Sequence, residues 1–427
     1  MKAADFLIAA KRVEIESLRQ LVDVCNLVTE LGNLVHSLQR ERGLTNVYLA
    51  SGGERLADAR LQQIAVSVAC EQKLQGLLQL LGGAQWRGSA RLLSAVAYVL
   101  QGLVELNGLR VKMNGCELAP AKATTAFGRL IAGLLSVVGE VADSAGDPAL
   151  SRGLVSLLNL MQGKEYAGQE RAWVSIGFAQ GAFDDRLKER QAHLQAAQKH
   201  ALEVFNQFAE ADLGERWRQI EASQSALELN RLRALVGGLA AGQAIAPEIS
   251  EVWYDLATQR IDAMRSLELE AVAALQALSG ARLAVAESEF KERQALLARL
   301  QPAEEGAPLL LTDRPPVSML LGELAGGLEV AESGLARSLF DVIQEQGQHL
   351  NRVRVELEEA RQALSERKLV EQAKALLIKN LGLSEEMAYR KIQQRAMDSN
   401  LRLAEVSQIL IDAAKATGAK KVQTKRR

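Results

Sequence analysis

Aromatic residues make up only 4% of this 427-residue chain, which also has seven prolines, four histidines and three cysteines. So few aromatic residues and prolines argue against a fold built from sheets and tight turns. The cysteines (Cys25, Cys70 and Cys116) are odd in number and have no metal-ligand spacing, which predicts buried free thiols in a reducing compartment. The four histidines are scattered and form no catalytic pattern with a cysteine or a carboxylate.

Long apolar segments are also missing. No apolar run reaches the ~18–20 residues needed to cross a bilayer, and the short apolar patch near the N-terminus ends in charged residues, unlike a signal peptide. The sequence therefore predicts a soluble, cytoplasmic protein. The remaining composition is rich in Ala, Leu, Glu, Gln and Arg, and 48% of all residues are hydrophobic. This composition is typical of long packed helices and is sufficient for two or three domains.

Helical periodicity and its interruptions predict an all-α fold. We expect a helical bundle of long antiparallel helices, then a connecting helix, then a small domain of three helices. Four of the seven prolines lie between Gln301 and Ser318, which predicts a linker there. The expected helices cover Ala4–Tyr48, Leu56–Leu81, Ser89–Met113, Ala121–Ala142, parts of Ser151–Phe208, Arg216–Leu239, Pro247–Leu300, Met319–Leu364, Glu366–Asn380, Ser384–Met397 and Leu401–Lys415.

The first long helix places an arginine on its own apolar face. Leu31, Leu34 and Leu38 recur at three- and four-residue steps, and the next step of four falls on Arg42. A guanidinium in a helix core needs a partner, because its desolvation is otherwise very costly. A structural Arg–Glu pair and a bound anion would both satisfy it, and the pattern alone favours the structural pair.

Other arginines repeat this arrangement. Arg171 lies beside an apolar stripe, with Glu165 and Glu170 close enough in sequence to be structural partners. Arg260 falls within the apolar stripe of the helix that begins near Pro247. Two further candidates lie in the motif LNRLRALVGG, namely Arg231 and Arg233.

The C-terminal part of the chain is basic. From Glu366 to the end there are fourteen Lys and Arg against seven Asp and Glu, so this part carries +7 and the preceding residues carry −8. A basic module on an acidic chain favours a polyanionic partner. A loose basic tail over 417–427 supplies part of this charge and is the plainer explanation. Candidates to project outward towards nucleic acid are Lys374, Tyr389, Arg390, Arg395 and Arg402.

A heptad-like stripe precedes the basic module. It alternates steps of three and four residues, which is typical of a coiled coil and equally of an ordinary core stripe. A coiled coil here would join two copies of the chain into a homodimer. The residues are Leu350, Val353, Leu357, Ala360 and Leu364.

The segment ERKLVEQAKALLIKNLGLSEEMAYRKIQQRAMDSNLRLAEV (366–406) resembles an ANTAR domain, the RNA-binding output domain of bacterial transcription antiterminators. The ERK…AK start, the GLSEE turn, the AYR helix and the RAMDSNLRL junction carry the resemblance, although Ile378 replaces the usual Met. The resemblance implies binding to paired stem-loops in leader RNA, which prevents a terminator. In that role an exposed Tyr389 would stack on a base, and Lys374, Arg390 and Arg395 would hold phosphates. Packing of Tyr389 on the first helix of the module explains a tyrosine at this position about as well.

Two other segments, LQRERGL (38–44) and KEYAGQERA (164–172), resemble the signature helices of the NIT nitrate- and nitrite-sensing domain. The order NIT then ANTAR is that of nitrate-responsive antiterminators of assimilation operons. The resemblance implies that Arg42 and Arg171 bind nitrate or nitrite, with Arg260, Arg231 or Arg233 as a third arginine. The helical wheel favours Arg260 for this role. Nitrate is planar, so a guanidinium can donate to two of its oxygens at once.

We therefore expect a sensor over 1–300, a proline-rich linker and connecting helix over 301–364, an RNA-binding domain over 365–416 and a basic tail over 417–427. We expect no cofactor other than the ligand, no metal and no membrane association. The sequence has no nucleophile–base pair and no phosphate-binding loop, which argues against an enzyme. The alternatives are a helical sensor of another small anion, a DNA-binding regulator, or a scaffold with a buried Arg–Glu lattice.

Overall fold

A computed structural model describes residues 3–81, 89–246, 248–299 and 339–424. These residues form twelve helices and no β-strand, which confirms the predicted all-α fold. The helices are α1 (Ala3–Ala50), α2 (Ala57–Leu81), α3 (Ala90–Asn114), α4 (Pro120–Ser144), α5 (Pro148–Ala179), α6 (Asp185–Phe208), α7 (Ala211–Glu221), α8 (Gln224–Gly238), α9 (Ile249–Arg299), α11 (Leu339–Leu381), α12 (Glu385–Ser399) and α13 (Leu403–Thr424).

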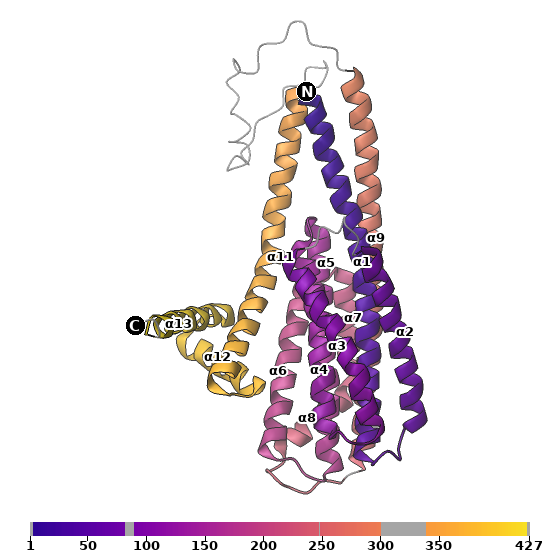
Figure 1. The fold of residues 1–427 in the computed structure, drawn as a ribbon, viewed down its shortest axis with the longest axis vertical. Helices are drawn as coiled ribbons and strands as arrows, with labels where there is room; N and C mark the ends of the chain where they lie inside the picture. Colours follow the sequence, from indigo (N-terminus) through magenta and orange to yellow (C-terminus); the bar gives the residue numbers. More distant parts are fainter. Residues whose placement is uncertain (1–2, 82–88, 247, 300–338, 425–427) are drawn as a thin grey trace.

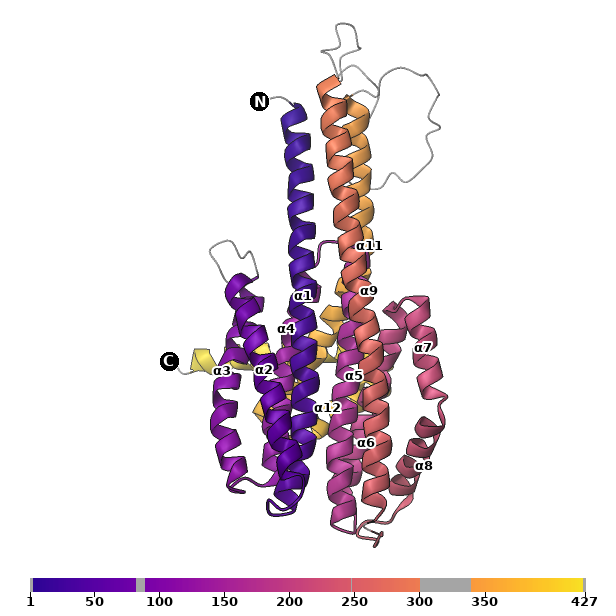
Figure 2. The same ribbon diagram turned by 90° about the vertical axis from the view of Figure 1, so that its right-hand side faces the viewer.

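The sensor consists of two groups of helices that pack side by side (Figure 2). The first group is α1 to α4, and the second is α5 to α9; α1 packs on α9 and α4 packs on α5 where the groups meet. Helices α1, α9 and α11 extend beyond the rest of the bundle in the same direction (Figure 1). The ion pairs Lys11–Glu289 and Arg19–Glu287 join the extended parts of α1 and α9.

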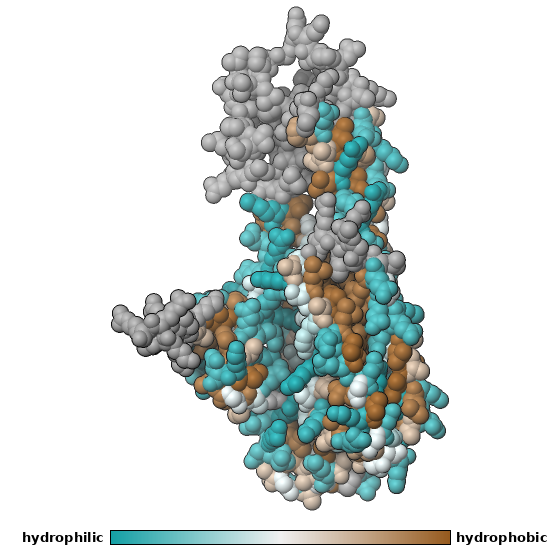
Figure 3. Space-filling view, in the orientation of Figure 1, coloured by the Kyte–Doolittle hydropathy of each residue, from teal (hydrophilic) through white to brown (hydrophobic). Residues whose placement is uncertain are grey.

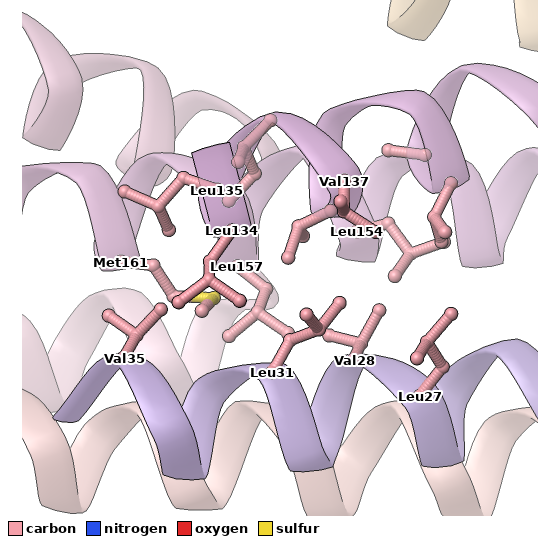
Figure 4. Close-up of a cluster of buried hydrophobic side chains, with 14 of the residues drawn as sticks. Leu27, Val28, Leu31, Val35, Leu134, Leu135, Val137, Leu154, Leu157 and Met161 are labelled. Carbon is pink, nitrogen blue, oxygen red and sulfur yellow. The ribbon is translucent and has the colours of Figure 1, made fainter. Parts of the chain in front are cut away.

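The main core lies where α1 crosses α4 and α5 (Figure 4). Leu31, Leu34 and Leu38 of the predicted stripe are all at most 1% exposed, which confirms the periodicity. Leu134 from α4 and Leu157 from α5 meet this stripe and are fully buried. Burying each such leucine stabilises the fold by roughly 1.5–3 kcal/mol.

Two expected helices differ from the structure. The stretch Arg216–Leu239 is not one helix, because α7 ends at Glu221 and Ser223 caps the start of α8 by accepting a hydrogen bond from the amide of Ala226. The expected short helix Glu366–Asn380 is the last part of α11, which runs without a break from Leu339 to Leu381. No glycine or proline stands near residue 365, so nothing in the sequence stops the helix at the expected domain boundary.

The prediction that the three cysteines are buried is only partly correct. Cys25 is buried and Cys70 is half-buried, but Cys116 is exposed. Cys116 lies in the turn between α3 and α4 with φ at +53°, so it is held on the surface by the turn. The proline-rich segment 301–318, the start of the expected helix 319–364 and Pro247 lie outside the described residues.

The described helices are more apolar than the absence of long uninterrupted apolar runs suggests. By length and composition, α3, α4 and α9 are each long and apolar enough to cross a membrane. The mean hydropathy of 18 consecutive residues is high in these helices even though charged residues interrupt the apolar runs. Helix α4 is covered by α1, α3 and α5. Helix α3 leaves Leu93, Val104 and Val111 exposed, and a hydrophobic band runs over it in Figure 3.

Candidate anion site and output interface

Arg42 forms a structural ion pair, which is one of the two alternatives that the sequence allowed. Its Nη1 and Nη2 atoms donate to the two carboxylate oxygens of Glu165 on α5 at 2.5 and 3.1 Å. Gln39 and Gln169 donate to the same carboxylate at 2.9 and 2.8 Å. Arg42 and Glu165 are each only 1% exposed, so this is a fully desolvated pair between the two helices.

Arg171, also on α5, has no such partner. It is 4% exposed, and it forms no ion pair with a carboxylate in the described part of the chain. Its Nη1 donates to the Thr258 hydroxyl at 2.8 Å, the guanidinium carbon lies 4.8 Å from the centre of the Tyr254 ring, and Nε has no hydrogen-bond partner. Burial lowers the pKa of Arg171 below its ordinary value, and the nearby Arg42 lowers it further. Tyr254 and Asp262 act in the opposite direction but do not outweigh burial, so a positive charge is held in the core without a carboxylate ion pair among the described residues.

Two glycines bring the arginines together at the crossing of α1 and α5. A Cβ atom at Gly43 would lie 2.7 Å from Nη2 of Arg171, and a Cβ atom at Gly168 would lie 2.7 Å from Nη2 of Arg42. Each guanidinium therefore fits into the gap left by a glycine on the opposite helix. The sequence places Gly43 directly after Arg42, but it does not indicate that this glycine makes room for the guanidinium of Arg171.

Gln39 links the two arginines and was missed by sequence reasoning. Its amide donates to Glu165, and its backbone oxygen accepts a long hydrogen bond of 3.5 Å from Arg171. Its side-chain oxygen accepts no hydrogen bond from any residue that the structure describes. An unpaired acceptor and the unpaired Nε of Arg171 therefore lie in the same small region. Gln39 stands one helical turn before Arg42, so its spacing was the available signal.

The three candidates for a further arginine differ in their positions. Arg231 lies exposed on the surface of α8. Arg233 reaches inward and forms an ion pair with the buried Glu170. Arg260 is 8% exposed, lies over the Trp217 ring at 5.2 Å, and leaves its Nε unpaired; burial lowers the pKa of Arg260 to about 10. The structure therefore brings Arg42 and Arg171 together and does not bring Arg231 to them.

Buried acid–base pairs are common in this sensor. Arg110 binds both Glu41 and Glu71 at 2.8 Å, and Lys164 pairs with Glu268 without exposure of either side chain. The expected Arg–Glu lattice is therefore present as part of the scaffold. Arg60, Arg171 and Arg260 share this burial but form no ion pair with a carboxylate among the described residues, and Arg171 differs from the other two in lying beside Arg42.

His36, on α1, should make the stability of the sensor depend on pH. Burial, followed by the charges of Lys164 and Arg265, lowers the pKa of His36 from 6.5 to about 3. Between these pH values the unfolded chain binds a proton that the folded chain does not, so stability falls as the pH drops through this window. His36→Gln should flatten this dependence in melting temperatures measured from pH 7 to pH 4. The exposed His200→Gln is the control, and equal slopes for all three proteins would contradict the prediction.

The C-terminal domain, α11 to α13, docks on the sensor through α11 and α12. Lys368 on α11 binds Asp143 and Glu140 of α4 at 2.9 and 3.1 Å. Arg367 donates to Gln162 of α5 at 2.7 Å. Helix α12 lies beside α6, at one side of the bundle (Figure 1).

The heptad-like stripe is used within the chain. Leu357, Ala360 and Leu364 are buried, and the last two belong to the same hydrophobic core as α1, α4 and α5. The stripe is therefore the surface by which α11 packs on the sensor. The last three residues of the stripe are therefore not available for a coiled coil between two copies while α11 is docked; Val353 is half-buried, and the side chain of Leu350 lies outside the described residues.

Lys374 is not the outward-facing residue that was expected. It is 4% exposed and binds Glu371 at 3.0 Å and Glu385 at 2.8 Å. Burial lowers the pKa of Lys374, but Glu371, Tyr166 and Glu385 outweigh that effect and raise the pKa above its ordinary value. Lys374 therefore fastens α11 to the start of α12, and its charge is neutralised there.

Two other candidates contact the sensor. The ring of Tyr389 lies edge-on to His193 of α6, with 5.2 Å between the ring centres. Arg390 forms an ion pair with Glu189 of α6 at 3.0 Å. Arg395 and Arg402 are exposed, and Arg402 lies 3.7 Å from Glu366. The sensor thus contacts two of the residues expected to bind RNA: it half-buries Tyr389, whereas Arg390 remains exposed like Arg395 and Arg402.

Comparison with known proteins agrees with this architecture. Residues 33–276 match the family described as nitrate and nitrite sensing (NIT), and residues 358–411 match the ANTAR domain. The chain is 30% identical over 410 residues to the nitrate regulatory protein of Klebsiella oxytoca, covering 96% of this chain and 95% of the relative. The solved structure of the NasR transcription antiterminator superposes with a TM-score of 0.61 at 26% identity, covering 97% of this chain and all of that one.

These matches extend over the sensor and the output domain together. Both matched domains are regulatory, and neither similar protein is an enzyme, so the chain is a regulator rather than a catalyst. The NIT match alone covers more than half of the sequence. The chain therefore belongs to the family of nitrate- and nitrite-sensing transcription antitermination regulators that combine a NIT domain with an ANTAR domain.

Proposed function

We propose that this nitrate-responsive antitermination regulator binds nitrate or nitrite between Arg42 on α1 and Arg171 on α5, without any other cofactor. The observation that carries the proposal is the buried guanidinium of Arg171, which lacks a carboxylate partner in the described residues and lies beside Arg42. The descriptions of the family and of the relatives support nitrate as the anion.

The chemistry of the site suits a small planar anion. Two guanidiniums at one helix crossing repel each other, and an anion between them replaces that repulsion with attraction to both. Nitrate has three oxygens in one plane, which match the flat donor edges of two arginines. Glu165 already occupies one edge of Arg42, so the anion has to share Arg42 with this carboxylate or displace it. Arg260 remains our candidate for a third arginine, and Arg233 replaces Arg231 as the second choice.

The output of the switch is RNA binding by the ANTAR domain. We propose that the anion releases the docked domain, which then binds stem-loops of leader RNA in nitrate-assimilation operons and prevents termination. Release would uncover Tyr389 and free Arg390 from its ion pair with Glu189, and Arg395 and Arg402 are already exposed. Two stem-loops suit two copies of the domain, so a homodimer of the released form is part of the proposal. Action on nascent RNA implies a cytoplasmic location without membrane association.

Helix α5 offers a direct route from the anion to the output domain. Glu165 faces Arg42, and Arg171 lies under two turns further along the same helix. On another face of α5, Gln162 contacts Arg367, and Tyr166 is close enough to Lys374 to raise its pKa. A movement of α5 towards α1 therefore acts on the docking surface without passing through the segment 301–318. For the anion to release the output domain, it has to bind the released arrangement more tightly than the docked one.

Nitrate titration of the full-length protein tests the site. Sodium nitrate should raise the melting temperature, with about 2.7 kcal/mol of stabilisation at a hundred times the dissociation constant. Arg171→Ala should abolish this effect. Arg171→Lys should also fail, because an ammonium group cannot make the planar two-point contact. Nitrite, chloride and sulfate measured in parallel separate a nitrate sensor from a sensor of another anion.

A pair of glycine variants tests the geometry without removing a charge. Gly43→Ala puts a methyl group 2.7 Å from Nη2 of Arg171, so it should displace the guanidinium and weaken nitrate binding by at least about tenfold, or 1.4 kcal/mol. Gly76→Ala on α2 is the control, since a Cβ atom there meets nothing within 4 Å. If nitrate still stabilises Arg171→Ala and Gly43→Ala as it does the unaltered protein, the anion binds elsewhere.

A further inference from the structure

A second polar site lies between α1 and α2, apart from the Arg42–Glu165 pair. It is a groove of about 540 Å³, a size typical of sites for small organic ligands. Neither Arg42 nor Arg171 lines it. Helix α9 contributes one residue to it, Arg265.

The groove carries an excess of positive charge. Arg40 and Lys73 line it, are exposed, and form no ion pair with any residue that the structure describes. Arg265 has Glu268 as its carboxylate partner, but Lys164 shares that carboxylate. Glu30 is the one carboxylate among the lining residues, so the groove attracts anions.

The positive charges lie at two separate ends of the groove. Arg265 donates to Asn33 of α1 at 2.5 Å, and the charges of Lys73 and Arg265 both act on the thiol of Cys70, so these two cations share one end. Glu30, which accepts from Asn33, lies at this end too and offsets one of the two charges. Arg40 lies seven residues after Asn33 on the same helix, which places it about 10 Å further along the axis. A single nitrate ion is too small to reach both ends.

The middle of the groove is partly apolar and partly polar. Val66 of α2 lies between the two ends, whereas Leu44 and Ala59 line the groove about one turn or more beyond the level of Arg40. On its floor, Gln63 donates to the hydroxyl of Ser37 at 2.9 Å. The imidazole of His36 also lines the groove, and its buried Nδ1 has no hydrogen-bond partner. This middle section suits a short hydrocarbon chain with room for one polar substituent.

We propose that the groove binds a short dicarboxylic acid, with one carboxylate at Arg40 and the other between Lys73 and Arg265. The hydrocarbon segment then lies against Val66 and beside His36. Inorganic phosphate carries enough charge but has no chain to span the two ends. This site would give the regulator a second small-molecule input on α1, the helix that also carries Arg42. The proposal does not depend on nitrate binding.

Calorimetric titration of the full-length protein with glutarate tests the proposal, with butyrate as the probe that lacks the second carboxylate. Glutarate should bind at least tenfold more tightly than butyrate. Arg40→Ala combined with Lys73→Ala should weaken glutarate binding at least tenfold. The control combines Lys122→Ala with Arg129→Ala, which removes two exposed cations of α4 that lie outside the groove. This control should bind glutarate like the unaltered protein.

Arg171→Ala separates this site from the nitrate site, and it should leave glutarate binding unchanged. Loss of glutarate binding in Arg171→Ala would place the dicarboxylate at the nitrate site and overturn the proposal. The proposal is equally overturned by equal binding of glutarate and butyrate, by unchanged binding in the Arg40/Lys73 variant, or by no binding up to about 10 mM glutarate.

Discussion

Reversing the charges of Glu140 and Asp143 on α4 is expected to raise the RNA affinity of the full-length protein without nitrate by roughly 5- to 150-fold, the usual range of allosteric coupling. Both carboxylates bind Lys368 of α11, with distances of 3.1 and 2.9 Å. Glu140→Lys with Asp143→Lys puts three positive charges at this contact, so the output domain should leave the sensor. The substitutions lie on the sensor and therefore do not alter the RNA-binding surface itself.

Affinity for a labelled hairpin RNA, measured with and without nitrate at one ionic strength, is the readout. Nitrate should add little in the variant, because its output domain is already released. The matched control is Glu54→Lys with Glu117→Lys, which makes the same change in net charge on exposed residues that form no ion pair with the described chain. An equal gain in the control would mean that net charge, not docking, governs RNA affinity. Equal binding to duplex DNA would support the DNA-binding alternative.

The second large effect separates Arg42 from Arg171. Arg42→Ala should lower the free energy of unfolding by about 3–5 kcal/mol, because it leaves Glu165 buried without its cation. Arg171→Ala should leave the free energy of unfolding unchanged or raise it, since it removes a buried charge that has no carboxylate partner in the described chain. From the sequence alone, the two alanine variants would be expected to behave alike. The pairing of Arg42 with Glu165 is the reason for expecting them to differ.

Urea unfolding of Arg42→Ala, Arg171→Ala and the double variant Arg42→Ala/Glu165→Gln measures this difference. The double variant should recover much of the stability lost in Arg42→Ala, because a neutral amide costs less to bury than an unpaired carboxylate. If Arg171→Ala costs as much stability as Arg42→Ala, Arg171 is a structural residue. In that case the proposed anion site loses its main support.

Much of this architecture is present in local sequence patterns. The stripe through Leu31, Leu34 and Leu38 predicted which face of α1 is buried, and Ser384 predicted the start of α12. The position of Arg42 on that stripe predicted a buried guanidinium. These features depend on residues three or four positions apart, which are neighbours in any α-helix, so they are readable without knowing the fold.

Other features depend on contacts between distant parts of the chain. Glu165 lies 123 positions from Arg42 in the sequence. The residues around Glu165 and around Arg42 do not indicate that these two form a pair, nor that Arg171 is left without a carboxylate partner in the described chain. The inward position of Lys374 and the contacts of Tyr389 and Arg390 with α6 likewise follow from how the output domain docks.

The sequence by itself therefore determined the helices, their buried faces and the arginines that enter the core. Only the tertiary structure decided which buried charges are compensated and which surface of the output domain is covered. The physical reason is that burial follows from the periodicity of one helix, whereas the partner of a buried charge is set by the packing of several helices. The same apolar stripe on α11 could have faced a second copy, and it faces α5 because the chain folds back onto its own sensor.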